Sequence, residues 1–285
     1  MITPRILIIA GSDSGGGAGI QADIKTVTML GGHAMTAITA ITAQNTLGVQ
    51  AVHPVPPEMV AAQMRSVVED IGVDAVKIGM IGSAETAHAV ADVLEPLDVA
   101  VVFDPVMVAT SGAVLADAAT IAAFERLMAL ACVVTPNVAE LQALAGGSGE
   151  DEQAREAMAA VLVARHGVPV LAKGGDASGS RIADLLVTGA ATTRWFGERV
   201  DTRHSHGTGC TVASAIAAGL GSGLSLDGAI DRGIAYVRRT IAAAPGFGGG
   251  HGPMGHALGR MPFYDLLAAT DADGYDAAAF AARWS

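Results

Sequence analysis

The sequence has few of the features that mark membrane or nucleic-acid-binding proteins. In its 285 residues, no apolar run reaches the roughly 18–20 residues that a membrane helix requires. The apolar stretch after Arg5 ends at Gly11 and is too short for a signal peptide. The net charge of −11 would repel a nucleic-acid backbone. We therefore expect a cytoplasmic protein with neither a membrane nor a nucleic-acid partner.

Cysteine and lysine are also scarce. Cys132 and Cys210 are 78 positions apart, which gives neither a disulfide framework nor the spacing of a zinc site. Arginine supplies most of the basic residues, and lysine occurs only at positions 25, 77 and 173. A compact ammonium can bind a phosphate where the broad guanidinium of arginine cannot replace it. Each lysine therefore suggests a site, with chance among the basic residues as the alternative.

The chain is otherwise typical of a compact, enzyme-like body, with 51% hydrophobic and 16% charged residues. Short apolar runs alternate with stretches of helical spacing, which predicts βαβ units and an α/β fold with helices on both faces of a parallel sheet. We expect strands over 6–10, 37–42, 75–78, 99–103, 132–135 and 170–173. We expect helices over 20–30, 57–71, 84–94, 118–130, 153–166, 208–221 and 226–244.

Two further segments shape the expected organisation. Residues 182–187 and 192–200 predict an antiparallel hairpin near one edge of the sheet. Residues 1–245 are expected to form a single domain. The glycine-rich stretch 246–253 has the composition of a flexible linker, and 261–285 is expected to be a helical tail.

The segment Gly11–Gly19 has five glycines in nine residues, between an expected strand and an expected helix. It lacks the ending of a P-loop and the GxGxxG spacing of a dinucleotide site. Its place at the carboxyl end of a strand favours a ligand loop over a mobile turn. The literal GxGxxG over 250–255 follows no strand and is interpreted as a false match.

The most informative segment is His206–Thr211, which runs directly into an apolar helix. Two glycines flanking a threonine leave backbone N–H groups uncovered at a helix start, and this predicts an anion site. Cys210 falls in the first turn, where the same field favours a thiolate. His204 and His206 are interpreted as solvated or structural residues rather than metal ligands.

Other polar residues stand at strand ends. Asp104 follows a very apolar strand, and Lys173 precedes two glycines, a combination that suits phosphate. Asn137 and Glu140 form either a helix-capping pair or part of a Mg²⁺ site, and the motif alone favours capping. Gln44 offers a donor and an acceptor that suit the edge of a planar heterocycle, but this signal is weak alone.

Together these motifs resemble the ribokinase-like superfamily, and within it the hydroxymethylpyrimidine and phosphomethylpyrimidine kinases of thiamine biosynthesis. The resemblance covers about residues 5–245 in family order. It rests on 11–23, Gln44, 77–80, 104–106, 137–140, 173–175 and 206–211. It implies a three-layer αβα fold with a central, mostly parallel sheet.

The resemblance also implies a reaction and its residues. ATP would phosphorylate an aminopyrimidine alcohol and then its monophosphate, with Mg²⁺ as cofactor; a homodimer is allowed for. Gln44 would bind the aminopyrimidine edge, in a pocket lined by Gly11, Asp23, Met80, Val106 and Met107. ATP would be served by Asn137, Lys173 and Thr208, and Mg²⁺ by Asp104 and Glu140. The anion hole and catalytic groups would be Gly207, Thr208, Gly209 and Cys210, with Lys173.

Many sugar kinases of this superfamily carry an aspartate where Cys210 stands. A carboxylate about 4 Å from an anionic monophosphate would oppose it by roughly 4 kcal/mol at an effective dielectric near 20. A thiol can stay neutral, so Cys210 is hypothesised to permit two successive phosphorylations. A pyridoxal kinase is the alternative within the family. A sensing module that has lost catalysis is the alternative outside it, although Asp104, Glu140 and Lys173 argue against that reading.

Overall fold

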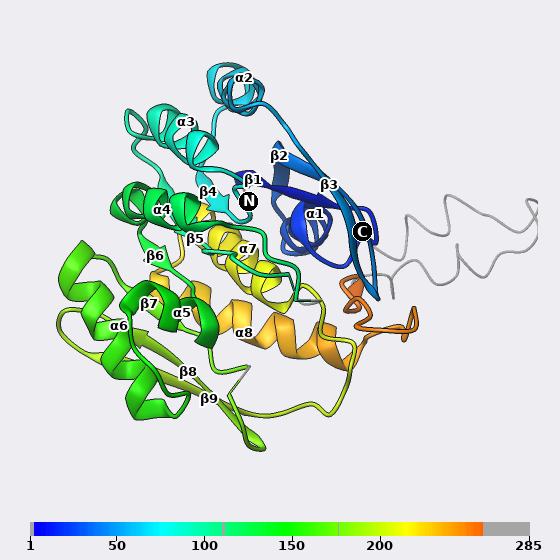
Figure 1. The fold of residues 1–285 in the computed structure, drawn as a ribbon, viewed down its shortest axis with the longest axis vertical. Helices are drawn as coiled ribbons and strands as arrows, with labels where there is room; N and C mark the ends of the chain where they lie inside the picture. The colour runs from blue at the N-terminus through cyan, green and yellow to red at the C-terminus, as the bar shows by residue number, and fades with distance from the viewer. Residues whose placement is uncertain (1–2, 110–111, 176, 259–285) are drawn as a thin grey trace, which may run out of the picture.

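The computed structural model describes residues 3–109, 112–175 and 177–258, whose strands form one nine-stranded sheet (Figure 1). The strand order across the sheet is β3-β2-β1-β4-β5-β6-β7-β8-β9. The strands are β1 (Arg5–Asp13), β2 (His33–Asn45), β3 (Gly48–Pro54), β4 (Ala75–Ile78), β5 (Ala100–Phe103), β6 (Val133–Val134), β7 (Val170–Ala172), β8 (Arg181–Val187) and β9 (Thr192–Glu198).

The six central strands pair in parallel and both edges of the sheet are antiparallel. This confirms the expected mostly parallel sheet and the hairpin of β8 and β9. Strand β3 and the full length of β2 were missed in the sequence. Every residue of β3 is at least partly exposed, so β3 lacks the buried apolar run that marks a strand.

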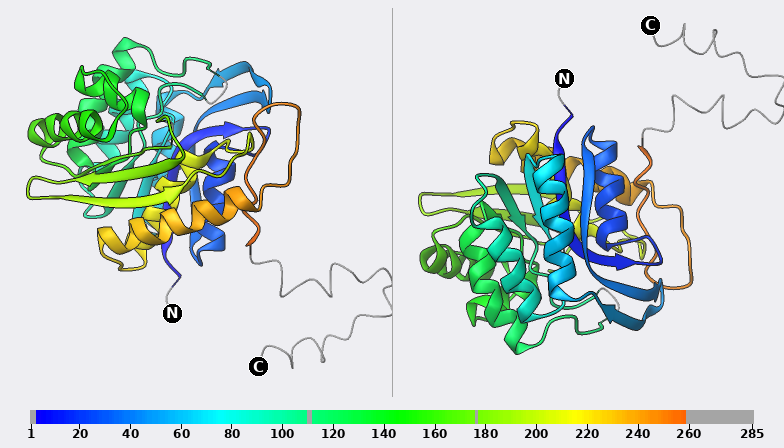
Figure 2. Two further views of the ribbon diagram at one scale, coloured as in Figure 1. Left: turned by 90° about the horizontal axis from the view of Figure 1, so that it is seen from below. Right: turned by 90° about the horizontal axis from the view of Figure 1, so that it is seen from above.

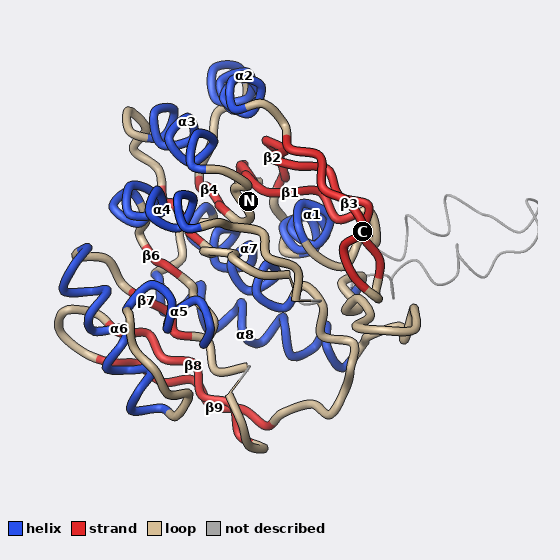
Figure 3. Tube along the Cα trace, viewed as in Figure 1, coloured by secondary structure: helices blue, strands red, loops and turns tan. Residues whose placement is uncertain are grey.

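Two layers of helices cover the sheet (Figures 2 and 3). Helices α2 to α6 pack their apolar residues on one face, and α1, α7 and α8 on the other. The helices are α1 (Gly19–Met29), α2 (Pro57–Asp70), α3 (Ala84–Leu94), α4 (Ala118–Leu130), α5 (Val138–Ala145), α6 (Glu152–His166), α7 (Thr208–Gly221) and α8 (Leu226–Ala242). The expected three-layer αβα arrangement is confirmed. Within the described residues, none of these helices has the length and apolarity to cross a membrane.

The glycine-rich segment after α8 packs against the body of the protein. Met254 and His256 are 3% and 4% exposed, and Pro253 forms a β-bridge with His206. The Thr211 hydroxyl lies 2.9 Å from Nε2 of His256, and burial lowers the pKa of that histidine to about 4. The backbone N–H groups of Gly250 and His251 also donate to Thr46 of the body. The expected linker over 246–253 and the domain boundary at 245 stay predictions. The expected helical tail over 261–285 lies outside the described residues.

Met254→Ala tests this anchoring. Removing a buried methionine side chain leaves a cavity, so the free energy of unfolding should fall by about 2–5 kcal/mol. Phe247→Ala is the control, because Phe247 is 66% exposed. It should change stability by less than about 0.5 kcal/mol. Equal effects of the two substitutions in urea denaturation would contradict the packing described here.

Candidate active site

A cavity of about 600 Å³ opens where the central parallel strands end. Its walls come from the glycine loop after β1, the end of β2, the segments after β5 and β7, the starts of α5 and α7, and α8. Ligands of open parallel sheets bind at this edge. The cavity brings together twelve of the residues singled out in the sequence: Gly11, Gln44, Met80, Asp104, Val106, Asn137, Glu140, Lys173, Gly207, Thr208, Gly209 and Cys210.

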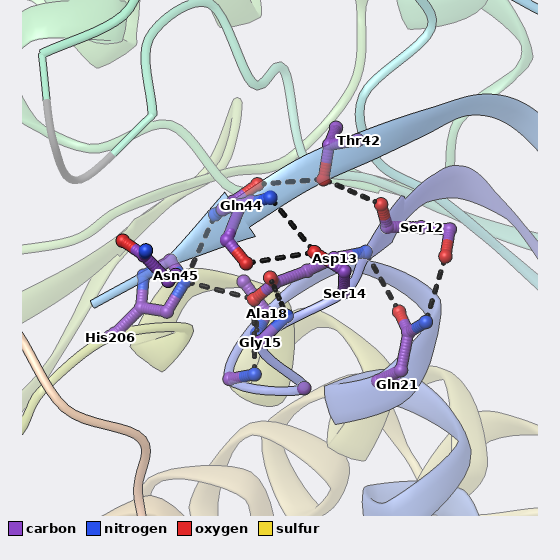
Figure 4. Close-up of polar contacts among 12 residues, drawn as sticks. Ser12, Asp13, Ser14, Gly15, Ala18, Gln21, Thr42, Gln44, Asn45 and His206 are labelled. Atoms are coloured by element: carbon purple, nitrogen blue, oxygen red, sulfur yellow. Dashed lines mark hydrogen bonds and ion pairs between the residues drawn. The ribbon is translucent and has the colours of Figure 1, made fainter. Parts of the chain in front are cut away.

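The glycine loop is folded around the carboxylate of Asp13, which is 3% exposed (Figure 4). One carboxylate oxygen accepts the N–H of Gly15, and the other accepts those of Gly17 and Ala18. Gly19 has φ +54°, and a side chain there would collide with the carbonyl of Gly11. The glycines therefore allow a tight loop that a buried anion organises. No sequence motif distinguished Asp13 from its neighbours in this loop.

Gln44 occupies an irregular position near the end of β2, where the pairing register with β3 shifts. Its side-chain amide lies between the Thr42 hydroxyl, at 3.1 Å, and Nε2 of His206, at 3.2 Å (Figure 4). His206 is 8% exposed, so it is a buried part of the wall and not a solvated residue. Gln44 lines the cavity, and its amide oxygen and NH₂ group can each form one more hydrogen bond there besides these contacts.

The anion loop begins at Gly207, the N-cap of α7, which has φ +87°. A Cβ at this position would collide with the Gly17 carbonyl oxygen, so the two loops are in direct backbone contact. No side chain caps the start of α7. The first-turn N–H groups therefore remain suited to an anion in the cavity. The Thr208 hydroxyl donates to the carbonyl of Ser205.

Asp104 and Lys173 form a buried ion pair beside the anion loop. Nζ of Lys173 lies 2.7 Å from Oδ1 of Asp104, which also accepts the Thr135 hydroxyl. A Cβ on Gly209 would lie 2.9 Å from this Nζ, so glycine brings the helix start against the lysine. Burial opposes the charge, but Asp104 and Glu140 raise the pKa of Lys173. A permanent cation therefore stands at the anion loop.

Asn137 and Glu140 form the capping box at the start of α5 that their spacing predicts. The Asn137 side chain accepts the Glu140 N–H at 2.9 Å, and the Glu140 carboxylate accepts the Asn137 N–H at 2.8 Å. Both residues nonetheless line the cavity. Within the described residues, no group of three or more histidine, cysteine or acidic side chains stands ready to hold a metal.

Cys210 is a neutral thiol. Burial raises its pKa to about 11, although Lys77 opposes this, and the carboxylates of Asp23 and Asp104 raise it further. The expectation that the helix field favours a thiolate is therefore wrong, because burial and two nearby acids outweigh the helix start. A neutral thiol is consistent with the hypothesis that Cys210 permits the second phosphorylation because it does not repel the anionic monophosphate.

Two residues expected in the substrate pocket lie elsewhere. Asp23 is completely buried on α1, where its carboxylate accepts the Lys77 ammonium at 2.8 Å and the Ser214 hydroxyl at 2.7 Å. Met107 is 5% exposed and packs in the hydrophobic core below the loop after β5. Neither is part of the cavity wall. The family resemblance implied a role for both residues. It does not show whether a side chain lines the cavity or packs behind the residues that line it.

Lys77, the second of the three lysines, has a structural role. It is fully buried on β4, between Asp23 of α1 and the underside of the anion loop. Burial opposes its charge, but Asp23, Cys210 and Asp104 raise its pKa, so the ammonium keeps its proton. Through Asp23 and Ser214, this charge ties α1, β4 and α7 together. Lys77 is thus a positioning residue for the helix that carries the anion loop.

The cavity also has polar residues that no sequence motif indicated. Asp184 of β8 accepts the N–H of Gly174 at 2.8 Å, and so holds the glycine that follows Lys173. Arg238 of α8 lines the cavity, and its buried Nη2 has no hydrogen-bond partner among the described residues. Arg238 is one of the 14 arginines of the chain and lies on the amphipathic helix α8, so only the fold distinguishes it from surface arginines.

Comparisons with known proteins agree on one family. The family model described as phosphomethylpyrimidine kinase matches residues 13–255. The hydroxymethylpyrimidine/phosphomethylpyrimidine kinase of Rhizobium meliloti (strain 1021) is 48% identical over 261 residues, covering 90% of this chain and 97% of that protein.

Among solved structures, the phosphomethylpyrimidine kinase of Clostridium difficile 630 is similar, with a TM-score of 0.74 and 34% identity over 84% of this chain and all of that one. An ADP complex of Bacillus subtilis pyridoxal kinase has a TM-score of 0.84 and 31% identity, over 91% of this chain and all of that one.

The buried ion pair of Lys77 and Asp23 can be tested for its role in holding the helix that carries the anion loop. Lys77→Met should lower the free energy of unfolding by about 3–5 kcal/mol, because it leaves the Asp23 carboxylate buried without a counter-charge. The double variant Asp23→Asn, Lys77→Met should recover most of this loss. Arg126→Met, which removes an exposed ion pair with Glu95 and Asp92, should cost less than about 1 kcal/mol. If the Lys77 variant were as stable as the Arg126 variant in urea denaturation, the supporting role would be refuted.

Proposed function

The chain belongs to the phosphomethylpyrimidine kinase family, and we propose that it uses ATP to phosphorylate 4-amino-5-hydroxymethyl-2-methylpyrimidine and then the monophosphate, yielding the diphosphate for thiamine biosynthesis. One observation carries the proposal. A single cavity holds a heterocycle-binding amide, that of Gln44, together with an uncapped helix start and a charged lysine. This combination suits a small aromatic alcohol and a phosphoryl group in the same space.

The proposed transfer depends on positioning and charge more than on covalent chemistry. Gln44 would hold the ring so that its hydroxymethyl group points to the anion loop. The backbone N–H groups at the start of α7 would stabilise the phosphoryl group as its bond to ADP breaks and its bond to the substrate oxygen forms. Lys173 would neutralise charge on the nucleotide phosphates, assisted by Asn137 and Thr208 in binding ATP.

The residues at the cavity fit Mg²⁺ that arrives with the nucleotide. Magnesium is commonly held by one or two carboxylates together with substrate phosphates and water. Asp104 and Glu140 supply two carboxylates on the cavity wall, and there is no third acidic ligand among the described residues that would make a site of protein alone. When bound, the ion would neutralise charge on the phosphates. The cytoplasmic location and a homodimer stay predictions.

Cys210 supports the second transfer in particular. The monophosphate is already anionic at neutral pH, and a thiol with a pKa of about 11 adds no negative charge at the anion loop. The site can therefore accept both the alcohol and its phosphate ester. An aspartate at this position would favour the first substrate over the second.

Pyridoxal kinase activity is the second candidate. The structural similarity to the pyridoxal kinase of Bacillus subtilis, with its TM-score of 0.84, favours it. The 48% identity to the Rhizobium kinase favours the aminopyrimidine. A sensor without catalysis fits less well, because the charged groups that transfer requires stand together in the cavity.

The direct test supplies the purified chain with ATP, Mg²⁺ and either hydroxymethylpyrimidine, its monophosphate or pyridoxal, and identifies products by ³¹P NMR. We expect the monophosphate and then the diphosphate, with pyridoxal used more slowly. Gln44→Leu should lower kcat/KM for hydroxymethylpyrimidine by about a hundredfold, because buried polar contacts to the ring are lost. Gln50→Leu, on the exposed strand β3, should leave it unchanged. Exclusive phosphorylation of pyridoxal would refute the proposal.

Cys210→Asp tests why a thiol is needed. The added carboxylate should slow phosphorylation of the monophosphate by up to about a thousandfold, since each 1.4 kcal/mol of repulsion is about tenfold in rate. The first step starts from a neutral alcohol and should be affected far less. Cys210→Ser is the neutral control, for which both steps should stay within about tenfold of the unmodified protein. The explanation fails if single-turnover rates of the two steps fall equally in the aspartate variant.

A further inference from the structure

Asp13 and His206 are buried on the wall of the cavity, yet the proposed transfer uses neither. We infer that this pair fixes the orientation of the Gln44 amide and thereby selects rings that carry an amino group beside a ring nitrogen. The inference rests on the proposed function and adds a specificity-determining pair to it. The pair contacts Gln44 and the glycine loop, so its members are positioning residues.

The ionised state of Asp13 is the starting point. Burial disfavours its charge, but hydrogen bonds from His206, Ala18 and Gly15 outweigh it and lower the pKa of the carboxyl group. Asp13 is therefore a carboxylate at neutral pH, and a carboxylate can only accept hydrogen bonds. Its Oδ2 lies 3.0 Å from Nε2 of His206. Nε2 must carry a proton, because two acceptors at this distance would repel each other.

The proton on Nε2 decides how the amide of Gln44 lies. One end of the amide is 3.2 Å from this Nε2, and the other end is 3.1 Å from the Thr42 hydroxyl oxygen. An amide nitrogen facing a protonated Nε2 would place two donors against each other. Nitrogen and oxygen of an amide have nearly the same shape, so the hydrogen-bond network assigns them. Figure 4 draws the amide nitrogen toward His206 and the amide oxygen toward Thr42. We assign the reverse orientation, with the carbonyl oxygen on the His206 side and the NH₂ group on the Thr42 side.

Thr42 completes a consistent chain of donors and acceptors. Its hydroxyl lies 2.8 Å from the carbonyl oxygen of Ser12, to which it donates its single proton. The hydroxyl oxygen can then accept from the NH₂ group of Gln44. In this assignment the single Nε2 proton of His206 is shared between the Asp13 carboxylate and the Gln44 oxygen. On the far side, Gln44 donates to Thr42, which donates to the Ser12 carbonyl. Reversing the amide would break two of these contacts at once.

The packing leaves the imidazole little room to turn. A Cβ on Gly17 would lie 2.5 Å from Cδ2 of His206, so the ring lies directly against the glycine loop. The backbone N–H of His206 donates to the carbonyl of Gly252 at 3.2 Å, and Pro253 forms the β-bridge with the same residue. The glycine loop and the C-terminal segment thus hold the histidine between them.

A fixed amide distinguishes two kinds of ring. An aminopyrimidine presents a donor, its NH₂ group, next to an acceptor, its ring nitrogen, and it pairs with an amide in one orientation only. A hydroxyl group rotates and can donate or accept, so a ring with a hydroxyl in place of the amino group tolerates either orientation. A fixed amide orientation therefore strengthens binding of the aminopyrimidine and changes binding of pyridoxal little.

The first test reads the proton directly and needs no substrate. In protein with ¹⁵N-labelled histidine, long-range ¹H–¹⁵N correlation spectra report which ring nitrogen is protonated, and loss of signals in His206→Gln identifies His206. We expect a proton on Nε2 in the unmodified protein. A bare Nε2 would overturn the inference. Because no activity is measured, this result stands even if the proposed reaction is not found.

The second test measures selectivity, as the ratio of kcat/KM for hydroxymethylpyrimidine to kcat/KM for pyridoxal. His206→Leu should lower this ratio by about tenfold, mainly through the KM for the pyrimidine, because the amide is free to turn. His206→Gln keeps an N–H group near the position of Nε2 and should restore most of the ratio. His33→Leu, at the exposed start of β2, is the matched control.

A merely structural role of His206 would lower activity toward both substrates together and leave the ratio unchanged. That outcome would overturn the inference, whereas a specific loss with the pyrimidine supports it. If the unmodified protein phosphorylates only pyridoxal, the proposed function fails, and the NMR result alone then decides how the Gln44 amide is held.

Discussion

The backbone contact between Gly17 and Gly207 is the constraint on which the rest of the site depends. Neither position tolerates a side chain: one at Gly17 would meet His206, and one at Gly207 would meet the Gly17 carbonyl. The contact joins the loop after β1 to the start of α7, which are 190 residues apart in sequence. It thereby brings a ring-binding wall within reach of an anion site. Glycine is required here for close approach and, at Gly207, for a positive φ.

Two buried ion pairs lie around this contact, and a neutral cysteine lies between them. Lys77 pairs with Asp23 below the anion loop, and Lys173 pairs with Asp104 beside it. Such buried charges persist because each has its counter-charge within 3 Å. Cys210 lies among them as a neutral thiol. The incoming phosphate therefore meets cations and N–H groups without an uncompensated anion at the point of transfer.

The sequence was sufficient for the layered fold and for most of the cavity wall. Buried parallel strands are continuous apolar runs, and the residues at their carboxyl ends must share one edge of the sheet. Asp104 and Lys173 follow from this rule, whereas the loop 207–210 was indicated by its two glycines at a helix start. Strand β3 does not, because an exposed edge strand leaves no buried periodicity.

The errors at the site have a different cause. Asp23 and Met107 were expected on the cavity wall, but sequence spacing does not show whether a side chain points to the ligand or to the core behind it. His206 was interpreted only as a solvated or structural residue. It lies in a loop, and the sequence pattern of a loop does not show which side chains are buried. Its partners, Asp13 and Gln44, are 193 and 162 positions away in the sequence. Only the folded chain brings such partners together.

In the proposed reaction, selection of the ring and transfer of the phosphoryl group depend on one short segment. His206 contacts Gln44 through its side chain, and the next residue begins the anion loop. A displacement of His206 would therefore move the N–H groups at the start of α7 as well. In the proposed reaction, recognition of the ring and stabilisation of the transferred group thus depend on adjacent residues of one segment.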